Sequence, residues 1–282
     1  MQADCVPDLT DAEYELFRRL IYDKCGINLG PQKQQLVRAR LGKRMRAGQF
    51  NSYRAYYDFV RGDASGNELA GLIDAISTNT THLFRESQHF EFVRKMLRTW
   101  LDDSAWRAAN NELRCWSAGC SSGEEPYSLA MTLDDALSAS RTPWRILATD
   151  ISTQILDRAR RGVYESHRLG TVPAEFRRRY FVPAGKRGDN LVQVHPNIQS
   201  RIAFAHLNLM SPTFPFRLGF HFIFCRNVMI YFDRATQEGL VERFTRHLRP
   251  GGHLIIGHSE SLNAIKHALE YVQPTIYRKP ER

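Results

Sequence analysis

The sequence lacks the features that mark several classes of protein. No apolar run among its 282 residues reaches the roughly 18 to 20 residues that cross a bilayer, and its first residues form neither a basic nor an apolar leader. Its five cysteines are odd in number and irregularly spaced, without a CxxC pair, which argues against a disulfide framework and a tetrahedral metal site. We therefore expect a soluble cytoplasmic protein with reduced thiols and no bound metal.

The sequence does contain ample apolar material and an excess of positive charge. Hydrophobic residues make up 43% of the chain and aromatic residues 11%, which excludes a disordered chain and allows one large domain or two ordinary ones. The formal net charge of +9 attracts polyanions. Charge alone does not distinguish nucleic acid, anionic lipid and acidic protein as partners.

The first hundred residues predict helices almost throughout. Thr10 and Glu13 form a capping box for a first helix, which ends before Gly26. Apolar residues at helical spacing indicate further helices from Pro31 to about Ala47 and around residues 53–60, 69–76 and 90–101. We expect a small all-helical N-terminal domain over residues 1–84, followed by a linker and connecting helix to about residue 110.

From about residue 111 short apolar strands alternate with helices. This rhythm predicts an α/β domain over residues 85–282, with a parallel sheet covered on both faces. We expect strands at 113–118, 145–149, 202–206, 221–225, 253–257 and 271–278, and helices at 124–138, 152–161 and 234–248. The rhythm breaks between about 165 and 200, where 181–182 and 191–194 predict a small inserted β-hairpin subdomain.

A Gly/Ser loop at residues 119–123 marks the expected binding crevice. It follows a strand and precedes a helix, so its small residues let a ligand approach backbone N–H groups at the carboxyl edge of the sheet. The dinucleotide pattern GxGxxG is absent, and Glu124 and Glu125 at the helix N-terminus would repel a phosphate and favour a cationic ligand.

Asp150 follows the next strand, where a carboxylate can accept both ribose hydroxyls. An adenosine that carries positive charge and no phosphate is S-adenosylmethionine. An ordinary strand-to-helix turn is the alternative interpretation of the loop.

Several blocks of sequence resemble the chemotaxis receptor methyltransferases, the CheR family. They are residues 77–86 (STNTTHLFRE), 116–128 (WSAGCSSGEEPYS), 148–150 (ATD), 224–233 (FCRNVMIYFD) and 248–260 (LRPGGHLIIGHSE). The similarity follows the same order over nearly the whole chain. It implies a Rossmann-like S-adenosylmethionine-dependent methyltransferase domain that converts glutamate side chains on cytoplasmic receptor helices to methyl esters, leaving S-adenosylhomocysteine.

The resemblance also implies roles for individual residues. Carried over position by position, it places these residues around the cofactor: Asn79, Thr81, Arg85, Glu125, Asp150, Asn208, Leu209, Asn227 and Val228. It places Arg85 and Tyr231 at the methyl group and the incoming carboxylate. Such a displacement needs alignment and desolvation more than a general base, because the carboxylate is already ionised and the sulfonium already activated. A surface salt bridge for Arg85 and a core position for Tyr231 are the alternatives.

The second predicted helix has a basic face. At 100° per residue, these residues lie within roughly 100° of arc beside an apolar stripe: Lys33, Arg40, Lys43 and Arg44. The resemblance implies that this face binds an acidic receptor helix, and a merely solvated face is the alternative. Arg38 and Arg46 point elsewhere, and we expect them to be solvated.

Two rival functions share the expected cofactor. A nucleic-acid methyltransferase fits the positive charge, but it would carry an Asn/Asp-Pro-Pro-aromatic loop or a Pro-Cys nucleophile where residues 226–229 (RNVM) stand. A non-catalytic binding module would not need Arg85 and Tyr231. Cys225 ends an apolar strand and is predicted to be a core thiol, and His253, His258 and His267 show no metal-ligand spacing.

Partners follow from the resemblance as well. It implies that some relatives bind a C-terminal receptor tail by adding a strand at the inserted subdomain. We expect methyl-accepting chemotaxis receptors as partners, membrane contact only through the receptor, no nucleic-acid partner and no required oligomer.

Overall fold

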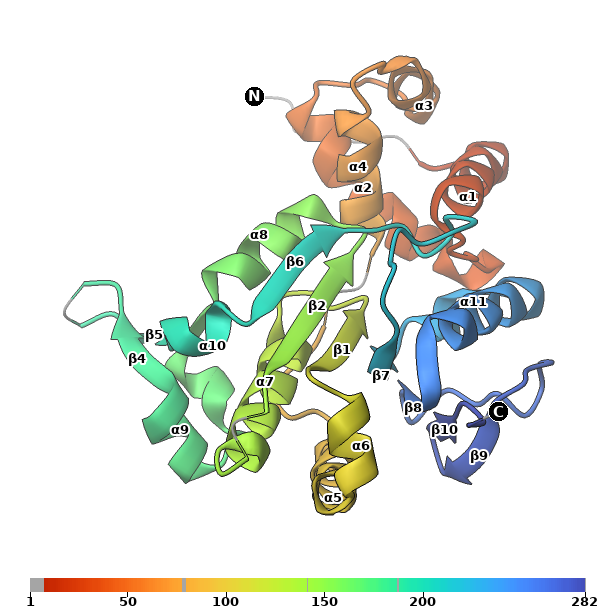
Figure 1. Ribbon diagram of the computed structural model, residues 1–282. Helices are drawn as coiled ribbons and strands as arrows, with labels where there is room; N and C mark the ends of the chain where they lie inside the picture. The colour runs from red at the N-terminus through yellow and green to blue at the C-terminus, as the bar shows by residue number, and fades with distance from the viewer. Residues whose placement is uncertain (1–7, 78–79, 141, 187, 282) are drawn as a thin grey trace.

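The computed structural model of the chain describes residues 8–77, 80–140, 142–186 and 188–281. Among these residues no helix combines the length and the apolar character needed to cross a bilayer. The N-terminal part, at the top of Figure 1, contains α1 (Asp11–Cys25), α2 (Gln34–Ala47), α3 (Tyr53–Gly62) and α4 (Asn67–Ile76). The predicted capping box at the start of α1 is confirmed.

The second helix begins later than the sequence predicted. Pro31 opens the 3-10 turn η1 (Pro31–Lys33), and α2 follows it. The Lys33 N–H donates to the carbonyl of Gly30 at 2.9 Å, a contact one residue shorter than an α-helical one. Lys33 therefore lies in a tighter turn than the rest of the basic face.

Aromatic packing holds the N-terminal helices together. Phe17 of α1 has no exposed surface, and its ring centroid lies 5.5 to 6.4 Å from those of Tyr53, Tyr56 and Tyr57 on α3. Edge-on and offset ring pairs of this kind add to the free energy gained from burial. This cluster is separate from the two cores that flank the sheet. Ile151, which directly follows the second strand of the sheet, packs against the cluster.

The second part is built on a seven-stranded sheet in the order β6-β2-β1-β7-β8-β10-β9. Its strands are β1 (Leu113–Ala118), β2 (Trp144–Asp150), β6 (Ile202–His206), β7 (Phe220–Cys225), β8 (Leu248–Ile256), β9 (Glu270–Gln273) and β10 (Ile276–Arg278). The first five named strands run parallel, whereas β10 is antiparallel to both β8 and β9. The single final strand predicted at 271–278 is therefore wrong: a turn at residues 274–275 divides it into two strands.

Alternate residues of the strands enter two different cores. Phe222 and Phe224 face the core formed with α5 (Gln88–Asp102) and α7 (Glu124–Leu137), whereas Ile223 and Cys225 face the core formed with α11 (Arg234–His247). Both faces are thus covered, as the near-continuous apolar strands predicted. The short helix α6 (Ser104–Ala109), which the sequence did not predict, leads from α5 into β1.

The inserted subdomain is larger than a hairpin. It contains η2 (Ser166–Leu169), α9 (Ala174–Tyr180) and a three-stranded sheet in the order β3-β5-β4, followed by α10 (Pro196–Gln199). The predicted hairpin corresponds to β4 (Phe181–Ala184) and β5 (Leu191–Val194), but β3 (Val163–Glu165) adds a third strand directly after α8 (Thr153–Arg161). Three residues are too short for an alternating pattern to reveal the strand.

Candidate active site

A pocket opens where β1, β2 and β7 end, and the N-terminal helices line its other side. It has about 1340 Å³ of empty space, part of which is open to solvent. Its lining includes every described residue that the resemblance placed at the cofactor or the methyl group: Thr81, Arg85, Glu125, Asp150, Asn208, Leu209, Asn227, Val228 and Tyr231. Asn79 lies outside the described residues.

Asp150 ends β2 at the edge of this pocket and is only 7% exposed. Its Oδ2 accepts a hydrogen bond from the Ser121 N–H at 2.8 Å, and its Oδ1 accepts one from the Ser152 N–H at 3.0 Å. Burial raises the pKa of Asp150, and the backbone N–H groups partly oppose that effect. Because a carboxylate offers about four acceptor positions, the side chain retains capacity for a diol such as that of ribose.

The two glutamates at the start of α7 have different partners and different positions relative to the pocket. Glu125 lines the pocket, where its Oε1 accepts from the Ser117 hydroxyl at 2.6 Å. Glu124 is 1% exposed and forms an ion pair at 2.8 Å with Arg168 of the inserted subdomain. Burial raises the pKa of both carboxyls. The prediction that both face a cationic ligand is therefore wrong for Glu124, because Arg168 draws it away from the pocket.

Arg85 sits in a turn with an unusual backbone. Phe84 and Glu86, on either side of it, have φ values of 54° and 56°, in the left-handed region that costs a residue other than glycine about 1 to 3 kcal/mol. The Phe84 N–H donates to the Ser128 hydroxyl at 2.8 Å. The Arg85 side chain is about one-third exposed and donates to the carbonyl of Thr80 at 3.3 Å. Its guanidinium is thus available at the pocket wall.

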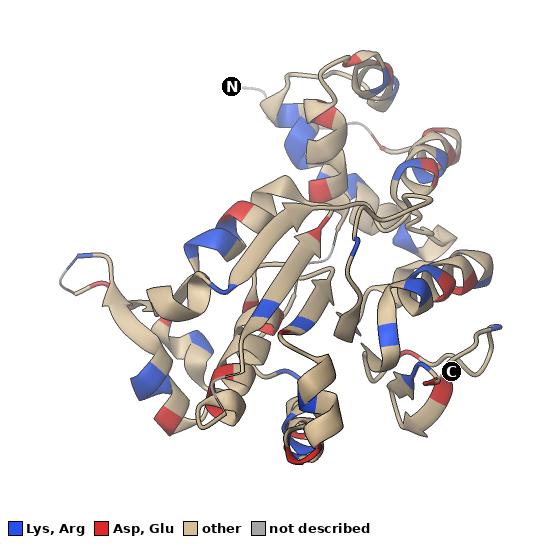
Figure 2. Cartoon of the chain, in the orientation of Figure 1, with Lys and Arg blue, Asp and Glu red and all other residues tan. Residues whose placement is uncertain are grey.

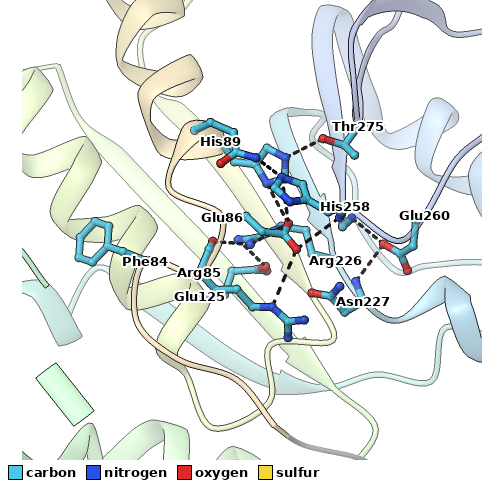
Figure 3. A network of polar contacts seen from close by, with 12 residues as sticks. Phe84, Arg85, Glu86, His89, Glu125, Arg226, Asn227, His258, Glu260 and Thr275 are labelled. Carbon is cyan, nitrogen blue, oxygen red and sulfur yellow. Dashed lines mark hydrogen bonds and ion pairs between the residues drawn. The ribbon is translucent and has the colours of Figure 1, made fainter. Parts of the chain in front are cut away.

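Arg226 joins this turn to the sheet (Figure 3). Its side chain is 2% exposed and lies directly after β7. One nitrogen donates to the carbonyl of Arg85, and the guanidinium forms ion pairs with Glu86 at 3.1 Å and with Glu125 at 3.5 Å. Burial raises the pKa of Glu86. The charge of Arg226, the backbone N–H of His258 and the imidazoles of His258 and His89 together outweigh that effect, so the pKa of Glu86 is lowered overall.

The opposite wall ties the pocket to the N-terminal part. Asn208 donates from its side chain to the carbonyl of Lys24 at 2.6 Å, and the carbonyl of Tyr231 accepts from the Asn28 N–H at 2.8 Å. Tyr22 donates to Asp233 at 2.5 Å. The N-terminal helices are therefore bonded to the segment that carries Tyr231.

The segment from Asn227 to Ile230 is shaped by one buried carboxylate. Glu260 accepts from the backbone N–H groups of Asn227, Ile230 and Gly257, at 2.9, 3.2 and 2.6 Å. Asn227 itself has a φ of 59°, and an added Cβ at Gly257 would lie 2.8 Å from its backbone nitrogen. This contact explains why glycine is needed at 257.

The basic face predicted for α2 is divided in the structure. Arg44 pairs with Glu68 of α4 at 2.8 Å, and Arg40 donates to the carbonyls of Ile76 and Ser77. Both are half-buried because α4 packs against that side of α2. Lys33 and Lys43 are exposed, and Lys33 lines the pocket. Arg40 and Arg44 thus already have partners within the protein, and receptor docking on the four-residue stripe stays a prediction.

Two flanking predictions for α2 have different outcomes. Arg46 is exposed, as expected, whereas Arg38 forms an ion pair with Asp8 at 2.5 Å. Positive charge is not confined to α2: Figure 2 shows Lys and Arg along α8, α9 and α11 as well. The net charge thus does not by itself identify a docking surface.

Neither the cysteine of β7 nor the histidines near Glu86 are assigned a nucleophilic or metal-binding role. Cys225 has no exposed surface, and burial raises its pKa far above the usual range, which confirms a core thiol. Glu86, His89 and His258 bring three ligand-type atoms within 4.8 Å of one another. Oε2 of Glu86 already accepts two hydrogen bonds from the Arg226 guanidinium, so we assign no metal to this group of three residues.

Sequence reasoning overlooked Arg226, Glu86 and Glu260 as individual residues. All three lay inside the blocks that carried the resemblance, but no role was inferred for them. The available signal was a charged residue placed directly after an apolar strand, which must find a partner when it is buried. Periodicity could not say which residues those partners are.

Comparison with known proteins agrees with this geometry. The family described as "CheR methyltransferase, SAM binding domain" matches residues 79–278, and "CheR methyltransferase, all-alpha domain" matches residues 12–77. The chain is 38% identical to a chemotaxis protein methyltransferase of Borreliella burgdorferi, over 96% of this chain and 95% of that one. It is 35% and 36% identical to the chemotaxis protein methyltransferases of Salmonella typhimurium and Escherichia coli, over 95% of this chain and 90% and 91% of theirs.

The pocket fits the cofactor that the family uses. Asp150 has acceptor capacity for a ribose diol, and Glu125 offers a carboxylate to a cation at the start of α7. Apolar side chains such as Ile151 and Leu209 also line the pocket. The chain belongs to the CheR methyltransferase family and is a methyltransferase that uses S-adenosylmethionine.

Proposed function

We propose that this enzyme methylates glutamate side-chain carboxylates of methyl-accepting chemotaxis receptors. The observation that carries the proposal is the set of cationic side chains that line the cofactor pocket. Lys33, Arg85 and the buried Arg226 all line the pocket. Positive charge at this place favours an anionic acceptor over a neutral one.

The acceptor's chemistry suits these residues. S-adenosylmethionine supplies an activated methyl group, and a glutamate carboxylate needs no deprotonation at neutral pH. Arg85 can align the carboxylate through two N–H groups, and the Tyr231 hydroxyl can donate a hydrogen bond beside it. The residues thus serve chiefly to orient the acceptor and to exclude water.

Two features weaken the rival functions. After β7 the pocket is lined by Arg226, Asn227 and Val228, without the Pro-Pro-aromatic loop or Pro-Cys pair of nucleic-acid base methyltransferases. Both Arg85 and Tyr231 line the pocket, which a module that only binds the cofactor would not require. The relatives reported above are all named chemotaxis protein methyltransferases.

Receptor docking extends beyond the pocket in this proposal. Lys33 and Lys43 remain exposed for an acidic receptor helix in the cytoplasm. β4 is an edge strand of the three-stranded sheet, a position at which an added strand, such as a receptor C-terminal tail, can pair.

The test is a methyl-transfer assay with labelled S-adenosylmethionine and receptor-containing membranes. We expect label on the receptor that mild base releases, as it does from methyl esters. Label that resists base, or label on tRNA or DNA offered in parallel, would contradict the proposal. Cofactor binding without transfer to any of these acceptors would favour the non-catalytic alternative.

A further inference from the structure

The turn that carries Arg85 must be held from outside. Phe84 and Glu86 both lie in the left-handed region of φ, at 54° and 56°. Residues other than glycine disfavour this left-handed conformation, which persists only where surrounding contacts impose it. Two such residues flank the one side chain that is proposed to orient the acceptor, so the contacts around this turn bear on the geometry of the reaction.

Arg226 makes three hydrogen bonds to this turn. Its Nη2 donates to the backbone carbonyl of Arg85 and to Oε2 of Glu86 at 3.1 Å, and its Nε donates to the same oxygen at 3.3 Å. Its guanidinium carbon lies 5.6 Å from the centre of the Phe90 ring at the start of α5. A rigid guanidinium that contacts both the carbonyl and the following side chain limits the positions open to the turn.

The same guanidinium is anchored on its other side. Its Nη1 lies 3.5 Å from Oε2 of Glu125. The other oxygen of Glu125, Oε1, accepts a hydrogen bond from the Ser117 hydroxyl of β1 at 2.6 Å. Figure 3 shows Arg226 between the Arg85 turn and Glu125. Arg226 thus links the turn to the sheet edge at which the cofactor pocket lies.

We propose that Arg226 is a positioning residue that holds the Arg85 turn in the geometry needed for methyl transfer. This inference rests on the proposed function, in which Arg85 orients the acceptor carboxylate. Further contacts on the turn come from the Ser128 hydroxyl, which accepts from Phe84, and from the His258 N–H, which donates to Glu86 at 3.3 Å. Loss of the Arg226 fork should therefore loosen the turn without unfolding the protein.

The first test compares Arg226→Lys with a matched control, Arg179→Lys. Lysine keeps the charge but cannot form the fork. Arg179 also pairs with two carboxylates, Asp134 and Asp135, and also lies over an aromatic ring, but it is outside the pocket. At saturating S-adenosylmethionine we expect Arg226→Lys to lower kcat for receptor methylation by about 10- to 100-fold with little change in KM, and the control to stay within about twofold of wild type.

A double-mutant cycle decides whether Arg226 acts through Arg85. In an Arg85→Ala background there is no guanidinium left to position, so Arg226→Lys should lower kcat further by less than about threefold. Equal losses in the two backgrounds would overturn the proposal.

Amide hydrogen exchange tests the same idea without any acceptor. In the presence of S-adenosylhomocysteine, Arg226→Lys should speed exchange at residues 84–90 relative to wild type and to Arg179→Lys, while β1 and β7 stay protected. Unchanged exchange in that segment would refute the positioning role. If wild-type protein fails to methylate receptors, the proposed function fails, but this experiment still decides whether Arg226 holds the turn.

Discussion

Replacing Asp150 by asparagine should weaken cofactor binding while leaving the fold intact. Both carboxylate oxygens accept a backbone N–H, from Ser121 and Ser152, at 2.8 and 3.0 Å. Asparagine offers one acceptor oxygen, so its NH₂ group must face one of these N–H groups and cannot accept a ribose hydroxyl on that side. A hydrogen bond to a charged group contributes about 1.5 to 3 kcal/mol, so S-adenosylhomocysteine affinity should fall roughly 10- to 160-fold.

Isothermal titration calorimetry at neutral pH measures this change directly. Asp157→Asn is the matched control, because Asp157 is an exposed residue of α8 that pairs with Arg160 at 2.7 Å. An exposed pair contributes little, so the control should bind within about twofold of wild type. Denaturation of each variant shows whether it is folded. A folded Asp150→Asn protein with affinity within twofold of wild type would remove Asp150 from the cofactor site.

The pH dependence of S-adenosylhomocysteine affinity is a second test of the role of Asp150. Burial raises the pKa of Asp150, so protons compete for the carboxylate at a higher pH than usual. Wild-type affinity should fall as the pH is lowered through that raised pKa, and Asp150→Asn should show less of this fall. Equal pH profiles would indicate that another group, such as Glu125, sets the dependence.

Tyr231→Phe should fold normally and lose about tenfold or more in kcat, less than Arg85→Ala loses, because it removes a hydroxyl and not a charge; near wild-type turnover would leave Tyr231 a structural role only. Lys43→Glu should raise the receptor KM by up to about fivefold and leave S-adenosylhomocysteine affinity unchanged, because Lys43 is exposed and lies outside the pocket lining, with added salt mimicking the effect; a receptor KM that responds to neither change would favour docking at β4. Burial lowers the pKa of His221 to about 3, so the unfolded chain binds a proton below pH 6.5 that the native protein does not, and native stability is lost as pH falls. In His221→Gln the slope of unfolding free energy between pH 6 and 4 should decrease by about 1.4 kcal/mol per pH unit, and an unchanged slope would count against neutral burial of this histidine.

Local signals in the sequence were sufficient for most of the architecture. The capping box at Thr10, the apolar strands and the Gly/Ser loop act between residues close together in the chain, so they could be recognised without a structure. The blocks of resemblance placed Asp150, Glu125 and Tyr231 at one pocket, and the fold brings them there.

The sequence did not reveal which neighbouring element covers a polar side chain. A helical projection places Arg40 and Arg44 on one face with Lys43, but it does not show which neighbour covers that face. In the folded protein α4 covers Arg40 and Arg44, and their charges are used within the molecule. A three-residue strand such as β3 was missed for a related reason, because it is defined by its partner β5 and not by its own pattern.

The sequence by itself determined most of the longer elements and which residues reach the carboxyl edge of the sheet, because the alternation of strands and helices along the chain and their apolar periodicity are local signals. Only the tertiary structure decided how the charges there are paired. Glu124 turns to Arg168 and Glu125 to Arg226, although the two glutamates are neighbours in sequence. Glu86 and Arg226 are 140 residues apart in the chain, yet they form one buried network. A buried charge takes whichever opposite charge the fold brings within reach, and that distance is a property of three dimensions and not of sequence spacing.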